Sequence, residues 1–90
     1  MEIIILDGLQ MIGRENAHNY LKKILRLPEY YGNNLDALND VLGEFGSGVY
    51  IILQHASFLR TEPTGYGERM ISVFREASSY ESAFTFIEKN

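Results

Sequence analysis

The sequence contains no cysteine, which excludes disulfide bonds and thiolate metal ligands. It also lacks any long apolar run: the first one covers only residues 3–6, whereas a membrane-spanning helix needs about 20 apolar residues. No basic segment precedes that run, so it does not have the form of a signal peptide, and we expect a cytoplasmic protein. A small domain without covalent cross-links depends on its apolar core, and 46% of the residues are hydrophobic.

Lysine and arginine are absent from residues 27–59, which carry Glu29, Asp36, Asp40 and Glu44. The formal net charge of the 90 residues is −4, and acidic and basic residues balance elsewhere, so this segment holds the whole net charge. A chain with this charge is not expected to bind nucleic acid directly. Its length allows one domain.

Strand-like and helix-like segments alternate along the chain. Nearly continuous β-branched runs predict three strands, at 3–6, 49–53 and 83–87. Apolar residues at helical spacing predict helices at 17–26, 34–43 and 68–80, and residues 56–60 are expected to form a short helical turn. Because helices separate the strands, we expect one compact α/β domain over 1–90 with a three-stranded parallel sheet. The apolar run at 3–6 further predicts a first strand that is buried on both faces.

The helix predicted at 34–43 has one apolar face and one acidic face. Its leucines and Val41 lie on one side of a helical wheel, whereas Asp36, Asp40 and Glu44 lie together on the other. Carboxylates spaced four residues apart repel one another, and no lysine or arginine nearby offsets the repulsion. A solvated outer face is the ordinary explanation of such a pattern. An uncompensated row of like charges also indicates a binding surface.

Three aromatic residues, Tyr30, Tyr31 and Phe45, bracket this helix. Each alone is most simply a core residue, but rigid aromatics beside charged groups are typical of interface anchors. Carboxylates and aromatics without a basic residue would complement a cationic surface, and an enzyme that binds nucleic acid has such a surface.

The run LPEYYGNNLDALND at 27–40 resembles the barstar family, whose members inhibit the secreted bacterial ribonuclease barnase inside the cell. Leu21-Lys22-Lys23 before this run and VFREA at 73–77 extend the resemblance over essentially the full chain. It implies a three-stranded parallel sheet packed with about four helices. It also implies that the acidic helix and the preceding loop block a ribonuclease active site, which is the action of a bacterial toxin-immunity protein. We expect a monomer when the protein is free, and no cofactor or metal.

The resemblance assigns partner-binding roles to individual residues. Asp40 matches the family's central acid, which takes the place of a substrate phosphate, and Asp36 matches a second acid one turn earlier. Tyr30 matches an aromatic contact in the preceding loop, and Glu76 matches a peripheral acid on the last helix. The expected partner-binding residues are Tyr30, Asn34, Asp36, Asn39, Asp40, Glu44, Phe45 and Glu76.

Three of these positions depart from the family pattern. Asn39 stands where the family has a tryptophan beside the central acid, and Phe45 stands at the position of a second tryptophan. Glu44 replaces a glycine. The acid pair is kept while its surroundings differ, which predicts a barnase-like ribonuclease as the partner rather than barnase itself.

Two other functions remain open. An enzyme or a Mg²⁺ site would use Asp36 and Asp40 as its carboxylates. Neither His18 nor His55 falls in a motif with them, and no phosphate-binding loop or nucleophile motif is present, so we expect no catalysis and no metal site. We expect both histidines to be structural or solvated. Alternatively, a protein of this fold could bind another basic protein without inhibiting a ribonuclease.

Overall fold

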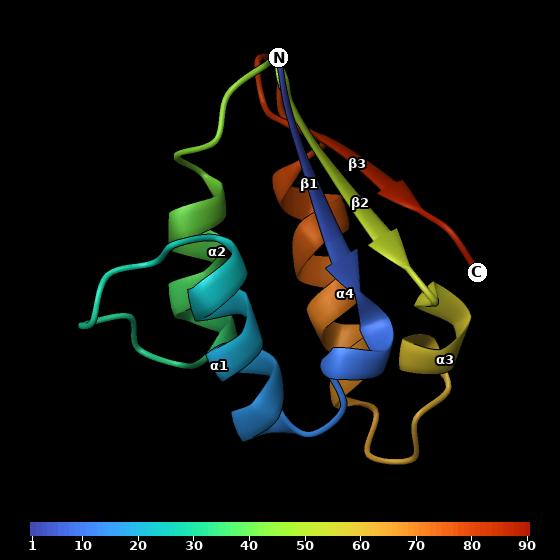
Figure 1. Ribbon diagram of the computed structural model, residues 1–90. Helices are drawn as coiled ribbons and strands as arrows, with labels where there is room; N and C mark the ends of the chain where they lie inside the picture. The colour runs from blue at the N-terminus through green and yellow to red at the C-terminus, as the bar shows by residue number, and fades with distance from the viewer.

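Strands and helices alternate along the chain in the computed structural model, which describes residues 1–90 (Figure 1). The elements in chain order are β1 (Glu2–Asp7), a 3-10 turn η1 (Gly8–Gln10), α1 (Arg14–Ile24), α2 (Leu35–Leu42), β2 (Val49–Gln54), α3 (Ala56–Arg60), α4 (Tyr66–Ala77) and β3 (Thr85–Glu88). The three strands form one parallel sheet in the order β1-β2-β3. The expected α/β fold is therefore confirmed.

The helices cover one face of the sheet: α1, α2 and α4 lie to one side of the strands, and α3 lies near their carboxyl ends (Figure 1). On the covered face, Leu6, Ile51 and Leu53 are buried. On the other face, Ile3 and Ile5 are 56% and 51% exposed. The prediction that the first strand is buried on both faces is wrong, because β1 lies at an edge of a sheet that has helices on one side only.

Several element ends differ from the expected bounds. α1 ends at Ile24, and Arg26 lies beyond it with a left-handed φ of 55°, which breaks the helix before Pro28. α4 begins two residues earlier than expected, directly after Gly65, whose φ of 80° suits a residue without a side chain. β3 begins two residues later than expected, because Ala83 forms only an isolated bridge with Gly46.

The core lies between the sheet and the helices and contains 17 buried hydrophobic residues. From α2, Leu38 and Leu42 are fully buried, while Leu35 and Val41 pack half-buried against the core. The apolar face expected for this helix is thus the face that packs inward, which leaves the acidic face at the surface. None of the helices has the length and hydrophobicity that crossing a membrane requires.

Candidate functional site

The start of α2 is fixed by the side chain of Asn34. Its Oδ1 accepts a hydrogen bond of 2.7 Å from the backbone N–H of Ala37, and its Nδ2 donates one of 3.1 Å to the carbonyl oxygen of Gly32. The first bond caps an otherwise unpaired N–H of the helix, and the second ties the helix to the loop before it. Asn34 therefore positions α2 relative to that loop, and its expected contact with a partner remains a prediction.

The row of carboxylates predicted for this helix lies on the surface. Asp36, Asn39 and Asp40 are exposed on α2, and Glu44 is exposed two residues beyond its end. None of the three acids forms an ion pair within the chain. Their charges are therefore not neutralised internally and are available to another molecule.

The two adjacent tyrosines in the loop before α2 point to different environments. Tyr30 is 88% exposed, whereas Tyr31 is 6% exposed and belongs to the core. The loop is held to α1 by Lys22, whose Nζ lies 3.2 Å from both the carbonyl oxygen and a carboxylate oxygen of Glu29. Only Tyr30 of the pair can therefore serve as an interface aromatic.

A hollow with mostly apolar walls lies between this loop and the end of α2. Three expected partner-binding residues, Tyr30, Glu44 and Phe45, line it together with Leu25, Arg26, Leu27, Pro28 and Val41. Phe45 is half-buried and packs edge-to-face on Phe84, with ring centroids 6.3 Å apart. The hollow can receive a partner side chain beside the acidic row.

Glu76 lies apart from these residues. It is exposed on α4, and no hydrogen bond or ion pair joins it to α2. The ends of the two helices nevertheless meet, because Glu44 and Ala77 line the same surface hollow.

A second cluster beside α2 was not predicted from the sequence. A hollow at the start of this helix is lined by Arg14, Asn34, Leu35, Asp36, Tyr66 and Arg69. Both arginines approach the ring of Tyr66, with Cζ atoms 5.9 and 5.4 Å from its centroid. Residues 14, 66 and 69 come from the first turns of two helices far apart in the chain, so no local motif could have indicated their proximity.

Beneath this cluster lies the buried His18. Its Nδ1 is 2.8 Å from the hydroxyl of Tyr31, and its Nε2 is 2.6 Å from the hydroxyl of Tyr66. Burial, with a smaller effect of the Arg14 charge, lowers the pKa of His18, and burial raises the pKa of Tyr31 to about 12. A neutral imidazole has one donor and one acceptor nitrogen, so one tyrosine accepts a hydrogen bond and the other donates one.

The other histidine lies at the surface. His55 is half-exposed, and its Nδ1 lies 3.0 Å from a carboxylate oxygen of Asp7. No three carboxylate or imidazole groups converge anywhere in the chain on a point where they could hold a metal ion. Neither histidine lies with Asp36 and Asp40 in one hydrogen-bonded group.

Comparison with known proteins assigns the chain to a family. The family model described as "Barstar (barnase inhibitor)" matches residues 1–87, which include α2 and the loop before it. A protein of Bacillus subtilis (strain 168) with the name "Putative ribonuclease inhibitor YrdF" is 37% identical over 78 residues, which cover 86% of this chain and 86% of that protein. The resemblance noted in the sequence is confirmed by these matches. The chain belongs to the Barstar (barnase inhibitor) family.

Proposed function

We propose that this protein inhibits a barnase-like bacterial ribonuclease by occupying its active site with α2 and the preceding loop. The observation that carries the proposal is the row of exposed, unpaired carboxylates on α2, in a chain of this family. The active site of a ribonuclease binds phosphate groups and is therefore lined by cationic side chains. Asp40 and Asp36 present negative charges that such side chains can bind in place of phosphates.

The inhibitor surface is prepared before binding. The Asn34 cap and the buried leucines hold α2 in place, so its acids need little ordering when a partner docks. Carboxylate–guanidinium hydrogen bonds are charge-assisted, and removing water from them at the interface strengthens them further. These bonds would slow dissociation, while the concentrated negative charge would speed association at low ionic strength.

Inhibition on this proposal is occlusion, in which the inhibitor performs no chemistry and uses no metal or cofactor. Tyr30 and Phe45, at the hollow beside the acids, supply the aromatic contacts. Asn39, in place of an aromatic residue, favours a ribonuclease related to barnase rather than barnase itself as the target. The protein would act in the cytoplasm, as a free monomer, to protect a bacterium from the toxin.

The experiment begins with co-expression of this chain and a panel of secreted bacterial ribonucleases that includes barnase, and growth rescue identifies the target. Asp40→Ala is then expected to weaken inhibition of that enzyme more than any other single substitution. Removing one partner of a buried charge pair costs about 2–5 kcal/mol, or about 30- to 5,000-fold in affinity, a range that draws partly on the barnase–barstar complex itself.

Glu15→Ala is the matched control, because Glu15 is an exposed carboxylate on α1 that forms no ion pair. We expect inhibition by this variant to stay close to that of the wild-type protein. An Asp40→Ala variant that inhibits as well as the wild-type protein, with a large effect at another position, would contradict the proposal.

Asn39 also favours a second candidate, in which a protein of this fold binds another basic protein and inhibits no ribonuclease. Pull-down from the native cell separates the two functions. Recovery of a ribonuclease supports inhibition, and recovery of non-nucleases alone supports the second candidate.

A further inference from the structure

Two arginines from different helices lie against one tyrosine ring. The Cζ atoms of Arg14 and Arg69 are 5.9 and 5.4 Å from the centroid of the Tyr66 ring, within the range of a cation–π contact. Neither arginine forms an ion pair with a carboxylate of the chain, whereas Arg75 binds Glu88 through two nitrogens. The two guanidinium groups therefore have free hydrogen-bond donors at the surface.

The tyrosine that supports them is itself fixed. Tyr66 is half-buried, and its hydroxyl lies 2.6 Å from Nε2 of the fully buried His18, which Tyr31 holds on the other side. A ring anchored in this way presents a constant face to the arginines. Their stacking on it limits the freedom that they would lose on binding a ligand.

The positions of these arginines are electrostatically unfavourable in the free protein. Both belong to the first turn of a helix, Arg14 in α1 and Arg69 in α4, where the helix dipole disfavours a positive charge. The nearest acid on α4, Glu68, pairs with Arg75 instead. Asp36 lines the same hollow but forms no ion pair with either arginine, so both guanidinium groups remain unpaired in the free protein.

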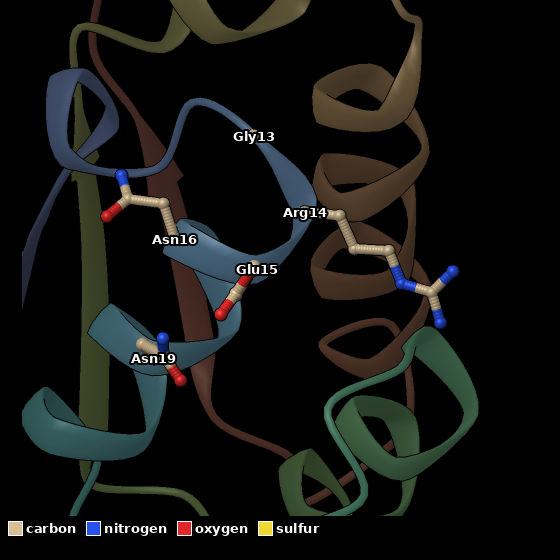
Figure 2. A pocket seen from close by; sticks show the side chains of 5 residues that line it. All are labelled: Gly13, Arg14, Glu15, Asn16 and Asn19. Carbon is tan, nitrogen blue, oxygen red and sulfur yellow. The ribbon is translucent and has the colours of Figure 1, made fainter.

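The arginines continue the proposed partner-binding surface. They line the same hollow as Asn34 and Asp36 at the start of α2. Figure 2 shows that the Arg14 side chain extends away from Glu15, toward α2 and α4. The row of acids on α2 therefore meets a cationic pair at its amino-terminal end.

We propose that Arg14, Tyr66 and Arg69 form a cationic subsite of the partner-binding surface, which receives a carboxylate of the same partner protein. This inference rests on the proposed function. It specifies the partner further, as a ribonuclease whose basic cleft is bordered by an exposed acidic residue. Arginine and tyrosine are also enriched, with tryptophan, among the residues that dominate binding energy at protein interfaces.

The presence of Asp36 favours a protein carboxylate over a free phosphate. Asp36 lines the same hollow and would repel a phosphate dianion. A protein surface can place a basic group against Asp36 and an acidic group against the arginines at the same time. The carboxylate can form paired hydrogen bonds with a guanidinium group.

The test replaces both arginines, with Arg14→Gln/Arg69→Gln, and measures inhibition of the ribonuclease identified by co-expression. We expect inhibition to weaken at least 10-fold. The partner is basic, so the loss of two positive charges should by long-range electrostatics alone strengthen binding slightly. Weaker inhibition therefore reports a local contact, provided that circular dichroism and thermal unfolding match the wild-type protein.

The matched control is Lys23→Gln/Lys89→Gln, which makes the same charge change at two exposed lysines that form no ion pair. Inhibition by this variant is expected to stay within about 2-fold of wild type. If the arginine variant inhibits as well as this control while Asp40→Ala fails to inhibit, the cationic subsite is wrong and the proposed function stands. If Asp40→Ala still inhibits fully, the proposed function itself is wrong.

A charge exchange identifies the partner group. Arg69→Glu should weaken inhibition, and a lysine in place of one carboxylate at the rim of the ribonuclease cleft should restore it at least 10-fold. A second experiment titrates the isolated protein with inorganic phosphate and monitors the arginine side chains by NMR. Saturable phosphate binding at Arg14 and Arg69, with inhibition unaffected by their replacement, would overturn the proposal.

Discussion

His18 is a fully buried side chain with two polar nitrogens, and it joins three segments of the chain. It lies on α1 and is hydrogen-bonded to Tyr31 from the loop before α2 and to Tyr66 at the start of α4. Its burial lowers its pKa, so the folded protein favours the neutral imidazole. In an unfolded chain the same group takes up a proton below about pH 6.5.

Stability should therefore depend on pH through this residue. The contribution of neutral His18 is complete above the unfolded pKa and is lost as the pH falls toward the lower folded pKa. We expect the free energy of unfolding to fall below pH 6.5, by up to about 1.4 kcal/mol per pH unit for one proton. Urea denaturation at several pH values between 5 and 8 measures this change in the free energy of unfolding. The His18→Gln variant should show a smaller change with pH.

Glu88→Gln is the control for this pH experiment. The hydrogen bond with Arg75 lowers the pKa of Glu88, so this carboxylate changes the free energy of unfolding only at a more acidic pH than His18 does. This variant should keep the wild-type slope above pH 5. An equally steep slope in His18→Gln would assign the pH dependence to other groups.

Asn34 illustrates a residue whose structural and binding roles can be separated. Asn34→Ala removes the acceptor for the Ala37 N–H and should lower the free energy of unfolding by about 1 kcal/mol. Asn34→Ser keeps a capping oxygen and should retain most of the stability in urea denaturation. Equal losses in the two variants would contradict the capping role, while a stable Asn34→Ser variant that inhibits less would indicate a direct partner contact.

At the scale of single elements, Gly67 of α4 lies directly against Leu59 of α3. A Cβ atom at this position would overlap the carbonyl oxygen of Leu59 and lie 2.9 Å from its Cδ1 atom. Because Gly67 has no side chain, α4 can pack against α3 at this position. This contact lies in the first turn of α4, between Tyr66 and Arg69.

Gly67→Ala should therefore destabilise the protein, by about 1–3 kcal/mol for overpacking, although alanine is the better helix former. Gly43→Ala is the matched control, because Gly43 has an ordinary helical φ of −64° and a Cβ there would meet its nearest atom at 3.4 Å. The control should be neutral or stabilised by up to about 1 kcal/mol. Similar urea denaturation midpoints for the two variants would contradict the close packing of α3 on α4.

At the scale of the whole molecule, the helices form a single layer on the sheet. Two neighbouring residues of β1 test this arrangement, because Leu6 is fully buried and Ile5 is 51% exposed. Leu6→Ala should lower the free energy of unfolding by about 2–5 kcal/mol, whereas Ile5→Ala should lower it by about 1 kcal/mol or less. Urea denaturation measures the free energy of unfolding of both variants. An equal decrease in the two would mean that the outer face of the sheet is covered.

The distribution of charge is the other property of the whole molecule. The net charge of −4 lies between residues 27 and 59; Asp36 and Asp40 lie on α2, and Glu44 lies two residues beyond its end. Beside them the fold places Arg14 and Arg69, which the sequence separates by more than half of the chain. The surface around α2 therefore carries negative and positive charges side by side, which a count of charges along the sequence does not reveal.

The local residue pattern is enough to predict the order and type of the strands and helices and the acidic face of α2. These features depend on the local repeat of the backbone, so the spacing of Leu35, Leu38 and Leu42 is enough to orient Asp36 and Asp40 outward. Element ends were less accurate, because they depend on single backbone conformations such as the left-handed Arg26.

Which residues meet across the chain depends on how the strands and helices pack. Tyr30 and Tyr31 are neighbours of the same type, but Tyr31 is buried against His18 and Tyr30 is exposed. In the same way, an apolar strand can be buried on one face or on two, and only the placement of the helices settled this for β1. The cluster of Arg14, Tyr66 and Arg69 likewise forms only because α1 and α4 begin side by side, since contacts between distant segments follow from packing and not from local periodicity.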